Sequence, residues 1–119
     1  MKKKYLRSTI LFFLTFLLTP GIQAQDDVLQ KLNEIAIIDQ KVMVPMRDGI
    51  RLATDIYRPK NIDKAPIIFS RTPYNFNSWR DGKENTRTAK QAYEAVKRGY
   101  AFVVQNERGR YFSEGEWDI

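Results

Sequence analysis

The sequence predicts an α/β fold in which an antiparallel hairpin leads into a parallel β–α–β unit. Three observations support this prediction. An Asp48-Gly49 pair lies between two apolar segments, and two continuous apolar runs, "IIFS" from Ile67 and "YAFVVQ" from Tyr100, flank a segment with helical periodicity. Such runs are typical of strands covered on both faces, and the order strand, helix, strand favours a right-handed parallel crossover.

The first 24 residues have the pattern of a secretory signal peptide. The basic stretch "MKKKYLR" precedes "STILFFLTFLLTPG", an apolar run that is short for a membrane span, and Ala24 supplies a small residue at the cleavage position. We therefore predict cleavage before Gln25 and export to the periplasm or the cell exterior, with membrane contact only through the leader. A retained membrane anchor is the alternative.

The charge of the chain argues against a nucleic-acid partner. The leader carries four basic residues and no acid, so the net charge falls from +6 to +2 without it. A charge this small leaves no basic footprint for a phosphate backbone.

The remaining chain divides into two parts. Residues 25–41 form a polar N-terminal segment, in which "DDVLQKLNEIAI" has the spacing of a short helix and Asp27 is a candidate N-cap. Residues 42–119 then carry a partial α/β domain.

The hairpin opens this domain. Strands are expected over 42–46 and 50–58, joined at Asp48-Gly49 by a two-residue turn. Because Pro45 cannot donate a hydrogen bond to a β-ladder, the first strand is predicted at a sheet edge.

The segment "TAKQAYEAVKRG" predicts the crossover helix. Thr88 and Gln91 have the spacing of a capping box, and Gly99 is placed to end the helix. An apolar stripe faces the core at four positions: Ala89, Ala92, Tyr93 and Val96.

Several kinds of chemistry are excluded by composition and local sequence. The chain has no His and no Cys, so it lacks the usual general base, the thiol nucleophile and the ligands of zinc or haem sites; we predict no metal and no cofactor. The stretch "RGRYFSEG" lacks the lysine of a phosphate loop and carries Glu114. Ser113 is followed two residues later by glycine, as in a nucleophile elbow, but Tyr111 would clash in that turn, so Ser113 is predicted to be a loop or capping serine.

Three stretches resemble one enzyme family, in the same order: "VMVPMRDGIRLATDIYRP", "PIIFSRTPYN" and "RGYAFVVQNERGRYFSEGEWD". They are similar to the opening of the α/β-hydrolases that include X-prolyl dipeptidyl peptidases, α-amino-acid ester hydrolases and cocaine esterase. The resemblance implies the N-terminal part of an α/β-hydrolase sheet, truncated before the nucleophile elbow and the triad.

The resemblance implies a catalytic role for Tyr74. In this family the tyrosine of the "RTPYN" motif offers its hydroxyl to the oxyanion of the tetrahedral intermediate. Independently, Tyr74 follows a predicted strand, and ligands of α/β sheets gather at the carboxyl ends of strands. A phenol is a neutral donor at pH 7, suited to developing negative charge. Considered without the family, a loop tyrosine is more commonly a packing residue.

The family pattern has one departure and one large gap here. The family commonly has an aspartate where this chain has Asn106, so any salt bridge would be replaced by a neutral hydrogen bond. The nucleophile, the acid and the histidine of the triad are all absent from this chain.

The expected function is therefore that of a longer enzyme, of which this chain is the N-terminal part. We expect the N-terminal fragment of an exported serine hydrolase that cleaves ester or amide bonds of a small acyl ester or peptide through an acyl-serine intermediate; the fragment itself should be inactive and only marginally stable. The alternative is a small exported binding or structural protein that uses the same sheet without catalysis.

Overall fold

The computed structural model describes residues 23–80 and 82–118, so nearly all of the predicted signal peptide lies outside the described residues. The described residues form two helices and six strands: α1 (Gln23–Ile35), β1 (Ala36–Pro45), β2 (Arg51–Pro59), β3 (Ile67–Thr72), β4 (Trp79–Arg80), β5 (Lys83–Glu84), α2 (Arg87–Lys97) and β6 (Ala101–Asn106). Within the described part of the chain, neither helix has the length and apolar character needed to cross a bilayer.

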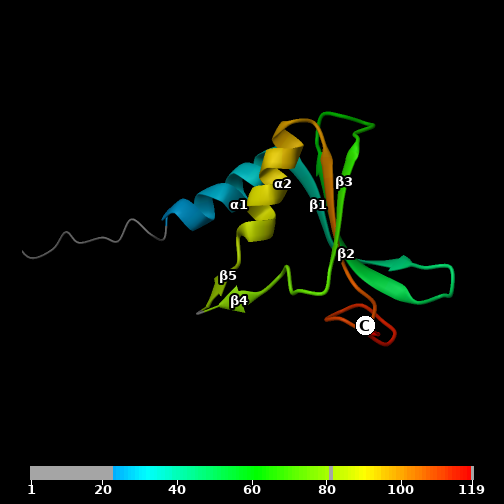
Figure 1. Ribbon diagram of the computed structural model, residues 1–119. Coiled ribbons are helices and arrows are strands. Elements are labelled where there is room, and N and C mark those ends of the chain that lie inside the picture. Colours follow the sequence, from blue (N-terminus) through cyan, green and yellow to red (C-terminus); the bar gives the residue numbers. More distant parts are fainter. Residues whose placement is uncertain (1–22, 81, 119) are drawn as a thin grey trace, which may run out of the picture.

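The main sheet has four strands in the order β1-β2-β6-β3. The β1–β2 and β2–β6 pairs are antiparallel, whereas β3 and β6 are parallel and are connected through α2. A separate two-stranded ribbon, β4–β5, follows β3 in the chain and precedes α2, and it lies below the two helices in Figure 1. The predicted hairpin and parallel β–α–β unit are both confirmed.

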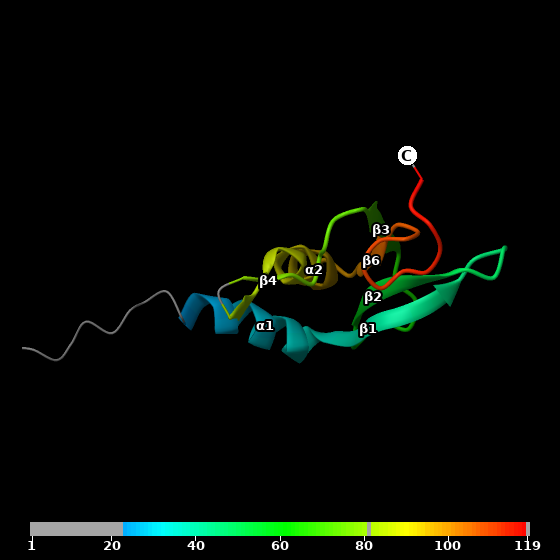
Figure 2. The ribbon, with the colours of Figure 1, turned by 90° about the horizontal axis from the view of Figure 1, so that it is seen from below.

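Both helices cover the same face of this sheet (Figures 1 and 2). Their apolar sides meet the side chains of β2 and β6 in one core cluster, formed by Leu32, Ala36, Tyr57, Ala89, Ala92, Ala95, Val96, Phe102 and Val104. The rings of Tyr57 and Phe102 contact one another in that core at a centroid distance of 6.2 Å. Burying this apolar surface is the main favourable term for the fold.

The N-terminal helix is present, but its predicted start was wrong. Asp27 lies inside α1, where its carboxylate pairs with Lys31 one turn later at 2.6 Å, instead of capping the first turn. The following strand also begins at Ala36, earlier than expected. The predicted polar segment is thus largely helix and strand.

The hairpin turn is longer than the two residues predicted from Asp48-Gly49. The Gly49 N–H donates to the Met46 carbonyl at 3.0 Å, and the Met46 N–H donates to the Ile50 carbonyl at 2.8 Å. Only Gly49 has a positive φ, +83°, so the loop is a turn followed by a left-handed glycine. Asp48 does not have the positive φ that a type I′ turn would require at this position. β1 does occupy a sheet edge, as Pro45 indicated.

The helix α2 confirms the predicted apolar stripe but not the capping box. Three of the four stripe residues are buried and Tyr93 is partly buried. The N-cap is Thr86, which makes no side-chain cap bond, and the Thr88 hydroxyl instead donates to the Phe76 carbonyl at 3.2 Å. This hydrogen bond joins the loop at Phe76 to the first turn of α2.

The strand β3 is where the burial prediction was wrong. It was expected to be covered on both faces, but residues 67–71 are all exposed, with Ile67 at 65% and Phe69 at 53%. In the described part of the chain β3 has one neighbouring strand, β6. The helices pack on residues of β2 and β6, and no residue of β3 belongs to that core cluster. β2 and β6, each paired on both sides, are the strands that are covered on both faces along most of their length.

Candidate active site

The candidate site lies where the parallel strands β3 and β6 end together. Thr72 and Asn106 are register partners in the last pair of the ladder. Beyond them, the loop with Pro73 and Tyr74 leaves β3, while the segment 107–118 leaves β6. Both therefore start at the carboxyl edge of the sheet, the position where α/β folds bind ligands.

The backbone of the Thr72–Tyr74 segment is held by hydrogen bonds from the β6 side. The side-chain amide of Asn106 donates to the carbonyls of Thr72 at 3.3 Å and of Tyr74 at 3.0 Å. The guanidinium Nε of Arg110 donates to the carbonyl of Pro73 at 3.1 Å. Within the loop, the Tyr74 N–H donates to the Thr72 hydroxyl at 3.1 Å. Each carbonyl in this short segment thus has a side-chain donor.

Ser113 fixes the C-terminal segment against the sheet. Its hydroxyl donates to the Asn106 carbonyl at 3.0 Å and accepts the Ala53 N–H at 2.9 Å, and the residue is 9% exposed. A serine that both donates and accepts inside the loop matches the predicted loop role.

Glu114 attaches the same segment to the start of β2. Its carboxylate accepts the Arg51 N–H at 2.9 Å and the Arg51 Nε at 3.0 Å, and its own N–H donates to the Arg51 carbonyl at 2.9 Å. The hydrogen bonds from Arg51 hold the pKa of the Glu114 carboxyl below its usual range. The segment 107–118 is therefore anchored to β2 as well as to β6.

Aromatic contacts hold Arg110 in place. Its guanidinium carbon lies 4.2 Å from the centroid of the Trp117 ring and 5.7 Å from that of Tyr111. The Trp117 indole N–H in turn donates to Glu107 at 3.4 Å. Stacking on an indole restrains a planar guanidinium and leaves its N–H groups aimed along the plane, here toward the loop.

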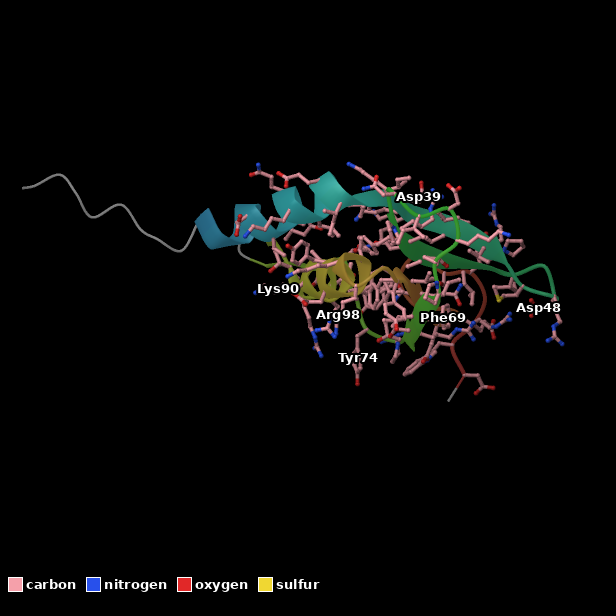
Figure 3. All side chains as sticks on the ribbon, turned by 90° about the horizontal axis from the view of Figure 1, so that it is seen from above. Asp39, Asp48, Phe69, Tyr74, Lys90 and Arg98 are labelled. Atoms are coloured by element: carbon pink, nitrogen blue, oxygen red, sulfur yellow. The ribbon has the colours of Figure 1, made fainter. Side chains whose placement is uncertain are left out.

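The side chain of Tyr74 projects away from the body of the molecule (Figure 3). It is 74% exposed, the largest exposure among the large hydrophobic and aromatic side chains reported as exposed in the described chain. The ring is thus neither a core packing residue nor turned toward the sheet. Its direction is set by the backbone that carries it.

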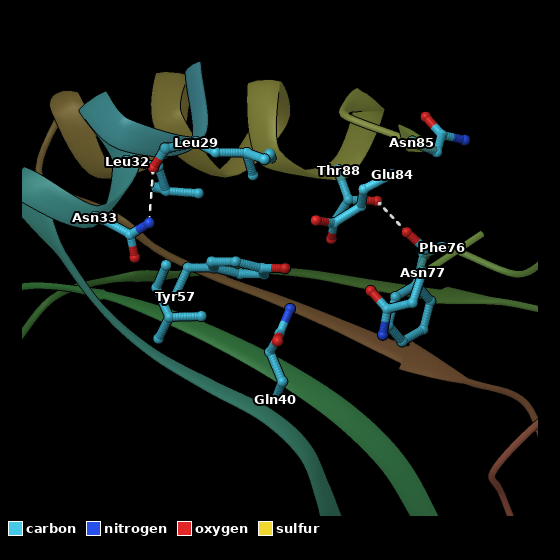
Figure 4. A pocket seen from close by; sticks show the side chains of 12 residues that line it. Leu29, Leu32, Asn33, Gln40, Tyr57, Phe76, Asn77, Glu84, Asn85 and Thr88 are labelled. Carbon is cyan, nitrogen blue, oxygen red and sulfur yellow. Dashed lines mark hydrogen bonds between the residues drawn. The ribbon is translucent and has the colours of Figure 1, made fainter. Parts of the chain in front are cut away.

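A cavity of about 370 Å³ lies on the helix side of the sheet, next to the residues that follow Tyr74 (Figure 4). Phe76 and Asn77 line one end, and the ring of Tyr57 crosses its floor beside Gln40 (Figure 4). Burial raises the pKa of the Tyr57 phenol well above its usual range, and the charge of Asp55 adds to the shift. Tyr57 is therefore a neutral donor within this cavity.

Comparison with known proteins shows the family of this chain. A family model described as X-Pro dipeptidyl-peptidase (S15 family) matches residues 48–119, more than half of the sequence. The chain belongs to this family. Its members are esterases and peptidases, so the predicted resemblance is confirmed at the level of a hydrolase family.

Known proteins of this family are much longer than the matched part. Cocaine esterase from Rhodococcus sp. (strain MB1 Bresler) is 42% identical over 81 residues, which are 67% of this chain and 13% of that protein. The structure of an α-amino acid ester hydrolase matches with a TM-score of 0.55 and 36% identity over 70% of this chain and 14% of its own. An aminopeptidase from the marine sediment archaeon Thaumarchaeota archaeon matches with a TM-score of 0.50 and 31% identity over 71% and 14%.

The sequence indicated Tyr74 but not the residues that hold its loop. Asn106 was noted only as a departure from the family pattern, and Arg110 only as part of a rejected phosphate loop. The signal that could have identified them is the register of parallel strands: a residue at the end of "YAFVVQN" must lie beside a residue at the end of "IIFSRT".

Proposed function

We propose that this chain is the N-terminal part of an exported serine hydrolase that cleaves ester or amide bonds, and that Tyr74 supplies a hydrogen bond to the oxyanion. The observation that carries the proposal is the position of Tyr74. Its exposed phenol lies at the carboxyl end of a parallel strand, on a loop whose backbone carbonyls accept hydrogen bonds from Asn106 and Arg110. The chain that carries it belongs to a hydrolase family.

The proposed reaction needs groups from beyond these residues. A serine hydroxyl attacks the acyl carbon while a histidine takes its proton, and the carbonyl oxygen of the substrate becomes an oxyanion. Tyr74 Oη–H donates to that oxygen, and a backbone N–H beside the nucleophile donates as well. Since the 119 residues contain no histidine, this chain alone should not hydrolyse acyl substrates.

The proposed substrate is a small acyl compound, an ester or a short peptide. The ester is suggested by the names of two relatives, cocaine esterase and an α-amino acid ester hydrolase, and the peptide by the family description. We favour an α-amino-acid ester or a related acyl substrate. Export follows from the basic and apolar leader, with cleavage before Gln25.

The first test is the coding DNA beyond the Ile119 codon. A frame that continues into a glycine-flanked serine elbow and a later histidine supports the proposal, whereas a stop codon directly after Ile119 contradicts it. In the encoded enzyme, Tyr74→Phe should lower kcat about a hundredfold with little change in KM, because one oxyanion donor is lost. Tyr100→Phe makes the same chemical change at the other end of β6 and should leave kcat unchanged. An unchanged kcat for Tyr74→Phe would exclude the oxyanion role.

A binding protein without catalysis is the second candidate. It is favoured by the cavity of about 370 Å³ beside α2, which combines apolar walls with the polar groups of Gln40, Tyr57 and Asn77. This candidate requires that the chain end at Ile119 and fold cooperatively as a monodisperse protein. A continuing frame with a serine elbow would rule it out.

A further inference from the structure

We infer that Asn106 and Arg110 are positioning residues for Tyr74, acting together as a clamp on three consecutive backbone carbonyls. The inference rests on the proposed function of Tyr74 for its effect on the reaction. The clamp itself is independent of that function, because it consists of hydrogen bonds between described residues. We define the clamp as the Asn106 amide and the Arg110 guanidinium bound to the carbonyls of Thr72, Pro73 and Tyr74.

The clamp begins where the β-ladder stops providing partners. Thr72 is the last residue of β3, and its carbonyl still accepts the Glu107 N–H at 3.1 Å. The next two carbonyls lie beyond the ladder and receive donors only from side chains in the described chain: Arg110 at Pro73 and Asn106 at Tyr74. Without these donors the turn after the strand would depend on water and on the single bond from the Tyr74 N–H to the Thr72 hydroxyl.

Asn106 acts through the two N–H hydrogens of its amide. Its Nδ2 group faces two carbonyl oxygens, which are acceptors only, so the side chain must present its two N–H hydrogens there. Asn106 is 3% exposed, and its own carbonyl is held by Ser113, so the amide cannot move away easily. Alanine at this position would leave both carbonyl oxygens without the side-chain donor that they have in this chain.

Arg110 reaches the middle carbonyl from a stacked position. Its guanidinium lies on the Trp117 ring at 4.2 Å, and this contact orients its Nε–H toward the Pro73 carbonyl. Lysine could not reproduce this contact, because an ammonium group has no planar face and no Nε. Arg110 lies in the segment 107–118 and Asn106 lies at the end of β6. The two residues therefore restrain the loop from two separate points.

The clamp matters because it holds the backbone from which the Tyr74 side chain projects. The side chain is 74% exposed, so packing does not select its direction, and the backbone at 72–74 sets the direction of its Cα–Cβ bond. A misplacement of about 1 Å in a catalytic group can cost about a hundredfold in rate. The clamp therefore fixes the direction in which the Tyr74 side chain leaves the backbone at the sheet edge.

The test uses the full gene product and two measurements that separate loop order from catalysis. The first is hydrogen exchange of the peptide that covers residues 72–76. Asn106→Ala and Arg110→Lys should each raise its exchange at least tenfold relative to the native protein, while peptides of α2 keep their protection. Asn33→Ala is the matched control. It removes an exposed amide in α1 that donates to the Leu29 carbonyl, so exchange of the peptide 72–76 should not change.

The second measurement is kinetic. Asn106→Ala should lower kcat about tenfold to a hundredfold with KM nearly unchanged, and in the Tyr74→Phe background it should lower kcat by less than about twofold, because the clamp acts through Tyr74. If Asn106→Ala does not fold, Arg110→Lys carries the same test. Native exchange in both clamp variants, or additive losses of kcat with Tyr74→Phe, would overturn the inference. If Tyr74→Phe leaves kcat unchanged while exchange still rises, the proposed function fails and the clamp remains.

Discussion

The carboxylate of Asp55 accepts a hydrogen bond of 2.8 Å from the backbone N–H of Lys41, at the point where β1 bulges away from β2. Asp55 is fully buried, and Lys41 has a positive φ of 54°, which is uncommon for a residue with a side chain. The register shifts between Asp39 and Val42, so the ladder offers no partner for this N–H. A buried acceptor on the neighbouring strand replaces the missing ladder bond and stabilises the bulge.

Asp55→Ala should therefore destabilise the fold. It removes the carboxylate that accepts the part-buried Lys41 N–H and leaves that N–H without its acceptor, which should cost about 1 to 3 kcal/mol. Denaturant titration of the purified protein measures this change. Asp39→Ala is the control, because Asp39 forms an exposed ion pair with Arg58 at 2.8 Å and should matter little. Equal losses for the two variants would contradict a special role of Asp55.

Gly109 should be the least replaceable glycine among those that the structure describes. It has a φ of +68°, and a Cβ at this position would overlap the backbone nitrogen of Trp117 and lie 2.6 Å from the Glu116 carbonyl carbon. Gly109→Ala should therefore displace the segment that carries Arg110 and Trp117. Gly49→Ala is the control, because Gly49 also has a positive φ, +83°, but a Cβ there meets nothing within 4 Å.

The two glycine variants separate steric overlap from backbone strain. Gly49→Ala should cost about 1 kcal/mol, the penalty for a side chain in the left-handed region, and Gly109→Ala should cost clearly more. Tryptophan fluorescence would report the change around Trp117 directly. A Gly109→Ala protein with native stability and native fluorescence would show that the segment can shift without cost.

The sequence predicted the order of the elements better than their surroundings. The apolar runs and the helical stripe depend on local periodicity, which a sequence displays directly. The burial of β2 does not follow from local periodicity. Ala53, Asp55 and Tyr57 share a strand face on which apolar and polar residues are mixed, yet all three are buried. Tyr57 is interior because residues of α1 and α2 pack with it in the core cluster, a tertiary contact that local periodicity does not display.

The candidate site shows the same division. Tyr74 could be identified because its motif resembles one family, and a motif is local. The clamp residues Asn106 and Arg110 lie more than 30 positions away in the sequence, and their role depends on the parallel register of β3 and β6. Single-sequence patterns do not carry that register.

Tyr57 should control the stability of the fold at alkaline pH. Burial raises the pKa of its phenol in the folded state, whereas the unfolded chain ionises near 10.0. The folded state therefore keeps a proton that the unfolded chain loses, so the contribution of Tyr57 is fully present below pH 10 and is lost as the pH rises above it. Above pH 10 this group should steepen the fall in stability by about 1.4 kcal/mol per pH unit.

Tyr57→Phe removes this titration and should give a flatter stability profile above pH 10. The measurement is urea denaturation at a series of pH values, with tyrosinate absorbance followed in parallel. In the native protein one tyrosine should ionise only when the chain unfolds. Profiles of equal slope for the native protein and Tyr57→Phe would contradict the buried, neutral phenol.

The exposed strand β3 should make the isolated chain self-associate. Ile67, Ile68 and Phe69 are exposed by 42% to 65%, and in the described chain one edge of β3 has no neighbouring strand. The other edge strand, β1, is protected by Pro45 and by its bulge, and β3 has neither device. An exposed apolar edge offers unpaired backbone groups and apolar side chains to a second copy.

A charge on β3 should therefore reduce association. Phe69→Lys should shift the 119-residue protein toward the monomer in light scattering and sedimentation, because a lysine on an edge strand opposes strand addition. Ile62→Lys is the control: Ile62 is 44% exposed but lies in the loop before β3, so the same apolar-to-lysine change should leave association unaltered. A native protein that is monomeric at all concentrations, or equal effects of both variants, would show that the β3 edge does not drive association.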